Sequence, residues 1–252
     1  FYWGSGFLPT RFQGARFRGS RDPVLYLKNP AGLKPELRRG LLDDLAKLNH
    51  MKFGQSGDPE IQTRIAQYEM AYRMQLSVPE ASDISNEPKH VLDMYGPECQ
   101  QPGKYAANCL LARRLAERGV RFIELIHTGS SGNWDSHGNM MDHQRLAKQI
   151  DRPIYGLLTD LKSRGMLDDT LVVWTTEFGR TPFNNKADAP GREHHNWAFT
   201  TFLAGGGVKG GVTHGATDEI GLKAVDHPVH THDFHATILY LLGLDHERLT
   251  HF

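Results

Sequence analysis

Apolar residues recur at helical spacing in the first part of this chain and also fall into short unbroken runs in the second part. Asp58 followed by Pro59 is a typical start of a helix, because Asp caps the helix and Pro fits its first turn. Near the other end, Thr231 is the predicted cap of the last helix. The predicted helices cover about residues 35–52, 58–76, 104–118, 143–164 and 233–242.

The strongest strand signal is the run of apolar residues Leu171, Val172, Val173 and Trp174. It shows no alternation of apolar and polar positions, which is typical of a central strand in a parallel sheet that helices cover on both faces. Helix and strand signals then alternate along the chain. Their order predicts an α/β fold with a largely parallel sheet sandwiched between helices. The predicted strands cover about residues 24–27, 120–126, 171–176 and 199–203.

These elements predict one domain over residues 1–252. Residues 1 to about 103 are interpreted as an irregular and helical excursion, and about 104–252 as the α/β core. Residues 79–103 contain four prolines and are predicted to form the least regular connection.

Composition narrows the possible partners. The 29 basic residues balance the 29 acidic ones, which argues against nucleic-acid binding because no net positive field would attract a polyanion. No apolar run reaches the roughly 18 residues of a membrane span, so no integral membrane segment is predicted. Most of the 14 histidines lie after residue 125, which suggests metal or proton chemistry there.

Asp135 and His137 are the first candidate ligands. They lie two residues apart in the loop after the predicted strand 120–126, so in an extended conformation both side chains point the same way and can bind one ion. The alternative is that they merely shape an Asx-type turn.

A second group of candidates follows the strand 171–176. Glu177 and Arg180 come at its carboxyl end, where open α/β sheets bind ligands. His194 or His195 in the next loop could complete the set, provided that the following strand runs antiparallel or that this loop folds back over the sheet edge. For Glu177 and Arg180, the alternative is a cap and a surface ion pair.

Mixed histidine and carboxylate ligands suit a divalent metal such as Zn, Mn or Fe(II). An all-oxygen site would instead favour Ca or Mg. The co-occurrence of the clusters near successive strand ends favours a metal site over three unrelated turns.

Several segments resemble known families. The strand TLVVWTTEFG resembles the strand and turn of the alkaline phosphatase superfamily, which includes sulfatases and phosphoglycerate mutases and has Asp-His-Gly at that turn. WDSHGN looks like the superfamily's Asp and His metal-ligand loop, and VHTHDFHATILYLLGL looks like the closing helix of sulfatases.

A closer resemblance spans essentially the whole chain. It is carried by GSGFLPTRFQG, CLLARRLAERGVRF, TEFGRTP, GREHHN, LAGGGVKGG and HATILYLLGLDHERLT, which look like the bacterial sulfatase-like family called domain of unknown function 1501. This resemblance implies an alkaline-phosphatase-like core and export to the periplasm or the extracellular space. It also implies a metal site made of Asp135, His137, Glu177 and His194, the last matching the histidine of the family's Gly-Arg-acid-His motif.

The chain departs from the superfamily pattern at one ligand position. Phe178 stands where the superfamily turn has a histidine, so we expect at most one well-formed metal centre. By the resemblance, the nucleophile and the first strand would precede residue 1, so the fold is expected to lack its N-terminal βα portion.

The leading hypothesis is therefore a metal-dependent hydrolase of sulfate or phosphate esters, acting on a small-molecule or glycan anionic ester. In this hypothesis Arg180 holds the anion and His127 transfers a proton. The alternative is a non-catalytic exported module of the same fold that binds a glycan or protein partner.

Overall fold

The structure, a computed structural model, describes residues 4–6, 8–9, 12–20, 23–24, 29–127, 133–186 and 190–250. The predicted strand at 24–27 lies mostly outside these residues. The chain divides into two compact units, and each is described by itself. The first comprises Phe1–Glu87 with Gln100–Lys104, and the second comprises Pro88–Cys99 with Tyr105–Phe252.

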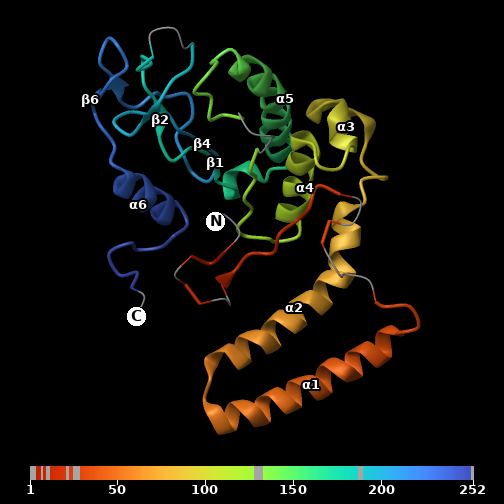
Figure 1. Cartoon of the computed structure of the whole chain (residues 1–252). Helices are drawn as coiled ribbons and strands as arrows, with labels where there is room; N and C mark the ends of the chain where they lie inside the picture. Colours follow the sequence, from red (N-terminus) through yellow and green to blue (C-terminus); the bar gives the residue numbers. More distant parts are fainter. Residues whose placement is uncertain are drawn as a thin grey trace. The chain divides into compact units, whose positions relative to one another are not determined.

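The first unit contains a hairpin of two long helices, α1 (Pro35–Ser56) and α2 (Pro59–Ser82) (Figure 1). Gly57 ends α1 in the left-handed conformation (φ 66°), which glycine adopts at little steric cost. Asp58 then caps α2 by accepting a hydrogen bond from the Glu60 N–H. Both predicted helices and the predicted Asp58 cap are confirmed, although each helix extends beyond its predicted end.

Prolines in the connection between the units begin helices instead of preventing them. Pro88 is the N-cap of α3 (Lys89–Tyr95), and Pro97 opens the short 3-10 helix η2 (Pro97–Gln100). Proline is tolerated at these positions because its missing N–H would have no partner in the first turn. The prediction of an irregular connection at 79–103 is therefore wrong for these segments.

The core of the second unit is a cluster of three helices. α3, α4 (Tyr105–Glu117) and α5 (Asp142–Ser163) pack against one another (Figure 1), so residues 88–99 belong with the core and not with the excursion predicted for 1–103. The helices predicted at 104–118 and 143–164 are confirmed. The largest fully buried side chains of this unit come from the three helices and η2; they are Arg113, Tyr95, Leu110, Leu146, Leu161, Asp160, Cys99 and Cys109.

A buried ionic cluster joins these helices. The Asp160 carboxylate accepts hydrogen bonds from the Tyr95 hydroxyl (3.0 Å) and from Arg164 Nε (2.6 Å). Arg113 Nε lies 2.8 Å from the same carboxylate, so the two opposite charges are in contact. The Nε–H does not point at the carboxylate, so this contact is not an aligned hydrogen bond. Glu117 contacts Arg113 and Arg164 at the edge of the cluster. Burial, together with the nearby Asp160 charge, raises the pKa of Tyr95.

The strands in the described residues form three antiparallel pairs. β1 (Val172–Trp174) pairs with β4 (Phe202–Ala204), β2 (Gly179–Arg180) with β3 (His194–His195), and β5 (Ala216–Thr217) with β6 (Ala224–Asp226). The strands predicted at 171–176 and 199–203 thus appear as β1 and β4. The larger parallel sheet sandwiched between helices stays a prediction, because no parallel pair occurs in the part of the chain that the structure describes.

Residues 120–126 do not form the predicted strand. They are not assigned to any element, and Phe122 keeps 75% of its surface exposed. An apolar pattern favours an extended backbone, but a strand also needs a neighbouring strand to bond with, and these residues have none among those described.

The cap of the last helix lies one residue before the predicted one, and the helix begins at Thr231, two residues earlier than predicted. α6 (Thr231–Leu241) has His230 as N-cap, whose Nδ1 accepts from the His232 N–H, while Asp233 accepts from the His230 N–H. This reciprocal pair replaces the predicted Thr231 cap. Across the described residues, no helix has the length and apolar character needed to cross a membrane.

Candidate metal centre

The candidate centre forms where two loop segments of the second unit, residues 133–140 and 190–195, run side by side. Two backbone hydrogen bonds of 3.2 Å join them, from Met140 N–H to the Pro190 carbonyl and from Arg192 N–H to the Ser136 carbonyl. Ser136 is buried between its neighbours Asp135 and His137, which leaves those two side chains exposed on the loop.

The approach of the two segments requires a glycine. A Cβ placed on Gly191 would lie 1.8 Å from the carbonyl oxygen of His137, which no real side chain could occupy. The His137 backbone can therefore rest directly against the second segment only because residue 191 has no side chain.

The pairing of β2 with β3 brings the third ligand into place. Arg180 lies directly opposite His194 in this antiparallel pair. The pairing continues beyond the strands, because Thr181 N–H donates to the Glu193 carbonyl and Glu193 N–H donates to the Thr181 hydroxyl, both at 3.0 Å. His194 thus reaches the loop of Asp135 from the β2–β3 pair, and the strand that follows it, β4, runs antiparallel to β1, which is one of the two arrangements that the sequence left open.

Three ligand atoms converge at this point. Asp135 Oδ1 lies 2.9 Å from His137 Nε2 and 2.8 Å from His194 Nε2, and the two nitrogens are 3.2 Å apart. Three of the four predicted ligands, Asp135, His137 and His194, are therefore brought together, and all three are exposed.

These separations suit a single transition metal ion. Two ligand atoms that bind one ion at about 2.0–2.1 Å lie about 2.9–3.3 Å apart for angles between octahedral and tetrahedral. The observed triangle of 2.8–3.2 Å matches three adjacent coordination positions. Because the three residues are exposed, the remaining positions would be accessible to water or substrate, as in catalytic and not structural zinc sites.

Glu193 supports the cluster from behind His137, and the sequence reasoning did not identify it. Its Oε2 lies 2.9 Å from His137 Nδ1, the ring nitrogen that does not face the cluster. A carboxylate that accepts the Nδ1 proton fixes the tautomer and leaves the Nε2 lone pair free for a metal. The acidic residue immediately before His194 in GREHHN was the available signal.

Phe178 packs against a ligand instead of supplying one. Its ring lies 4.1 Å from the His194 ring, centre to centre, at an angle of 32°. An aromatic neighbour at this distance restricts the orientation of the imidazole. Phe178 thus helps to position His194.

Arg180 neutralises the carboxylate of the cluster. Its Nη2 donates to Asp135 Oδ1 and to the Trp134 carbonyl, and its Nη1 donates to the Arg192 carbonyl. The hydrogen bond from Arg180, followed by that with His194, lowers the pKa of Asp135 to about 2. Asp135 is therefore a carboxylate at neutral pH, which is the form that binds a metal.

Two candidates of the second group lie outside the cluster. Glu177 is exposed, and its carboxylate accepts a hydrogen bond from the Thr176 hydroxyl (3.0 Å) without reaching the three ligands. His195 is buried, and its Nε2 contacts the Leu222 carbonyl. Of the two neighbouring histidines that the sequence offered, His194 is the one in the cluster.

His127, the predicted proton-transfer residue, lies in a separate aromatic group. Its Nδ1 accepts a hydrogen bond from the Trp134 indole N–H (2.9 Å), and its ring lies 5.0 Å from that of Tyr105. An indole N–H can only donate, so this nitrogen of His127 carries no proton. Burial lowers the pKa of His127, so the imidazole is held neutral.

The comparisons with known proteins agree with the closer of the two resemblances. A model of the family described as protein of unknown function (DUF1501) matches residues 2–252. The chain belongs to the DUF1501 family. No curated protein and no solved structure gave a significant match. Membership of DUF1501 covers both units, but it supplies no activity for the cluster of Asp135, His137 and His194.

Proposed function

We propose that this chain binds one divalent transition metal ion, Zn or Mn, through Asp135, His137 and His194. We further propose that the centre hydrolyses small-molecule or glycan esters of sulfate or phosphate. The observation that supports the proposal is the triangle of ligand atoms with 2.8–3.2 Å sides, exposed on one side and supported by Glu193. The resemblance of the motifs to sulfatases and the alkaline phosphatase superfamily supports the ester class.

When bound, such an ion acts as a Lewis acid on the ester oxygen and lowers the pKa of a bound water. Arg180 is placed to hold the anion beside it. A guanidinium has five N–H donors, and the three acceptors of Arg180 described above use the two hydrogens of Nη2 and one of Nη1. Nε and the second Nη1 hydrogen can then donate to an ester oxygen, since 18% of the side chain stays exposed.

His127 has a more limited part in this proposal. To accept a proton at Nδ1 it would have to release the Trp134 indole, and the buried surroundings already disfavour its charged form. Proton transfer through His127 therefore requires a rearrangement of Trp134, so solvent at the open side of the cluster is the simpler proton source.

A single centre limits the expected rate. The two-metal clamp of many phosphoryl-transfer enzymes needs ions about 4 Å apart, each with its own ligands. Phe178 occupies the position from which the superfamily supplies a further histidine, and here it packs on His194. We therefore expect weak hydrolysis of activated esters compared with two-metal enzymes.

The proposal predicts a defined metal content. After incubation with Zn²⁺ or Mn²⁺ and exhaustive dialysis, the purified chain should retain about one equivalent of metal by elemental analysis, as expected for one three-ligand centre. His137→Ala should lose that equivalent and, with it, any hydrolysis of p-nitrophenyl sulfate or p-nitrophenyl phosphate.

His246→Ala is the matched control, because this histidine is exposed and lies outside the cluster. It should keep the full metal content. Two tightly bound equivalents, or unchanged metal in His137→Ala, would show that the ligands are wrongly assigned. One equivalent without turnover of either ester would favour the non-catalytic binding module instead.

A further inference from the structure

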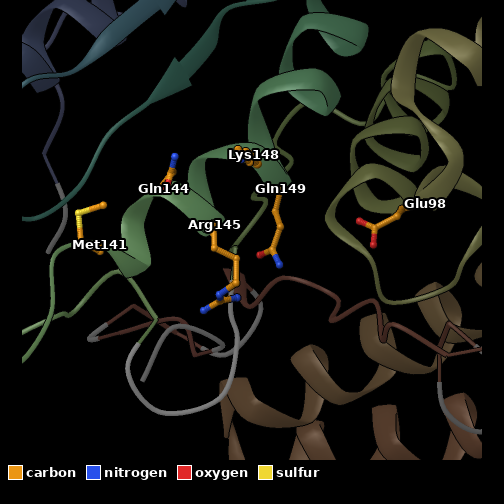
Figure 2. A pocket seen from close by; sticks show the side chains of 6 residues that line it. All are labelled: Glu98, Met141, Gln144, Arg145, Lys148 and Gln149. Atoms are coloured by element: carbon orange, nitrogen blue, oxygen red, sulfur yellow. The ribbon is translucent and has the colours of Figure 1, made fainter.

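A second concave site lies on α5, away from the metal ligands. Its volume is about 470 Å³, within the usual range for small-molecule pockets. Figure 2 shows Arg145 and Gln149 extending from the same side of α5, with Glu98 of η2 facing them. The described residues that line it all belong to the second unit; they are Glu98, Met141, Gln144, Arg145, Lys148 and Gln149.

The helical repeat explains why five of these residues share a face. Met141 is the N-cap of α5, and the other four follow it at spacings of three or four residues, which places them in a row along one side of the helix. Leu146, Leu157 and Leu161 are buried on the other side, in the helical core. Because the apolar face of α5 packs into the core, the polar residues on its opposite face point away from the core in a row.

The described residues that line the pocket carry a net positive charge. Arg145 and Lys148 lie three residues apart on α5, whereas Glu98 is the single acidic residue among the described residues of the lining. Within the described part of the chain, neither cation forms an ion pair with a carboxylate. A guanidinium and an ammonium at this spacing suit one sulfate, phosphate or carboxylate group, which Arg can bind with two parallel hydrogen bonds.

One wall of the pocket lies next to the aromatic group of His127 and Trp134. Burial lowers the pKa of His127, and the Gln149 side chain, close enough to act as a hydrogen-bond partner, opposes that shift; the Trp134 indole donates to His127 Nδ1. This neighbour limits the conformations of the Gln149 amide, so less side-chain entropy is lost when a ligand binds. The second amide, that of Gln144, can serve ligand hydroxyls in the same way.

We propose that this pocket binds a small hydroxylated molecule with one anionic group, of the size of a monosaccharide. Arg145 and Lys148 bind the anionic group, the amides of Gln144 and Gln149 bind hydroxyls, and Met141 contacts the C–H face of the ring. Glu98 accepts a ligand hydroxyl and disfavours a second negative charge. The proposal concerns binding alone, and none of these residues is a ligand of the metal centre, so it stands or falls independently of hydrolysis.

The test uses the full chain after metal removal with EDTA, so that the metal centre cannot contribute. Isothermal titration calorimetry at low ionic strength should measure binding of galactose 6-sulfate, glucose 6-phosphate or glucuronate. At least one of the three should bind about 10-fold more tightly than neutral glucose, because a hydrogen-bonded ionic contact is worth more than a neutral one. The tightest of the three identifies the anionic group.

Variants of the lining residues then test the assignment. Arg145→Gln and Lys148→Gln should each weaken binding of that ligand by about 5- to 10-fold, a loss reduced by solvent screening at an open site. Lys162→Gln is the matched control, since it removes a cation from the last turn of the same helix, outside the pocket. It should leave the affinity unchanged.

The expected effect of Glu98→Gln is tighter binding, which a loss of folded protein could not produce. Removing the only acidic residue of the lining should strengthen binding of the anionic ligand by about 3-fold, because a nearby like charge is lost. The proposal is overturned if none of the three anionic sugars binds, if glucose binds equally well, or if the Arg145 and Lys148 variants keep the wild-type affinity. Unchanged or weaker binding in Glu98→Gln would likewise overturn it.

Discussion

Single side chains decide whether the candidate centre can bind an ion, and the residues behind the ligands matter as much as the ligands. Glu193 fixes His137 through Nδ1, Phe178 packs on His194, and Arg180 holds Asp135 as a carboxylate. Each ligand thus has its own supporting neighbour. Loose ligands would lose affinity, because ordering them on binding costs conformational entropy.

Glu193→Gln should lower metal affinity without removing a ligand. A neutral amide is a weaker acceptor for the His137 Nδ1 proton and holds the ring less firmly, so we expect metal affinity to fall by about 10- to 100-fold. Competition with a chelating dye would measure the change. Glu219→Gln, at an exposed position, is the control, and equal affinities in the two variants would contradict a positioning role for Glu193.

His127 should make the second unit less stable at mildly acidic pH. Because its folded pKa is lowered, its contribution to the free energy of unfolding is full above the unfolded value of about 6.5 and is lost as the pH falls toward the folded pKa. Between about pH 7 and 5, the wild type should therefore lose more stability than His127→Gln, as measured by urea unfolding.

The Trp134 indole N–H resonance offers an independent readout. Protonation of His127 removes the acceptor of the indole N–H, so in the folded wild type the resonance should shift as the pH falls through the lowered pKa of His127. An identical pH dependence of stability in His127→Gln would show that other histidines cause the effect.

At the scale of elements, short strands position the residues of the candidate centre, and long helices support these strands. β2 and β3 each contain two residues, yet their register sets Arg180 opposite His194. Such short strands have little stability of their own. The ionic cluster around Asp160 joins α3, α4 and α5 within the same unit.

Asp160→Asn should destabilise the second unit strongly. Asp160 and Arg113 are each only 1% exposed, so removing the carboxylate would leave the Arg113 charge buried with less compensation. We expect the free energy of unfolding to fall by about 3–5 kcal/mol in urea denaturation. Asp151→Asn, at an exposed position of the same helix, should change it by less than about 0.5 kcal/mol. Similar losses in both variants would contradict the importance of burial.

At the scale of the whole molecule, both candidate sites lie in one of the two units. The first unit contributes a helical hairpin, whereas the metal ligands, the pocket on α5 and the helical core all belong to the second. The segment 133–149 begins with two candidate metal ligands and ends with residues that line the pocket. Both proposed sites therefore depend on how this segment is held against the core.

The sequence by itself determined the long helices and the chemical nature of the site. Apolar spacing and caps such as Asp58 are local properties, so α1, α2, α4, α5 and α6 could be placed from them. Asp135, His137 and His194 were recognisable as candidate ligands because of their side-chain types and their motifs. The family membership was also readable from motifs along the whole chain.

Only the tertiary structure decided how these residues meet. It selected His194 over His195, left Glu177 outside the cluster, and supplied Glu193 behind His137. The same holds for strands, since residues 120–126 have the pattern but no neighbour to pair with. Strand pairing and ligand convergence join residues distant in sequence, as in the contact of Gly191 with His137, and local patterns carry no information about such contacts.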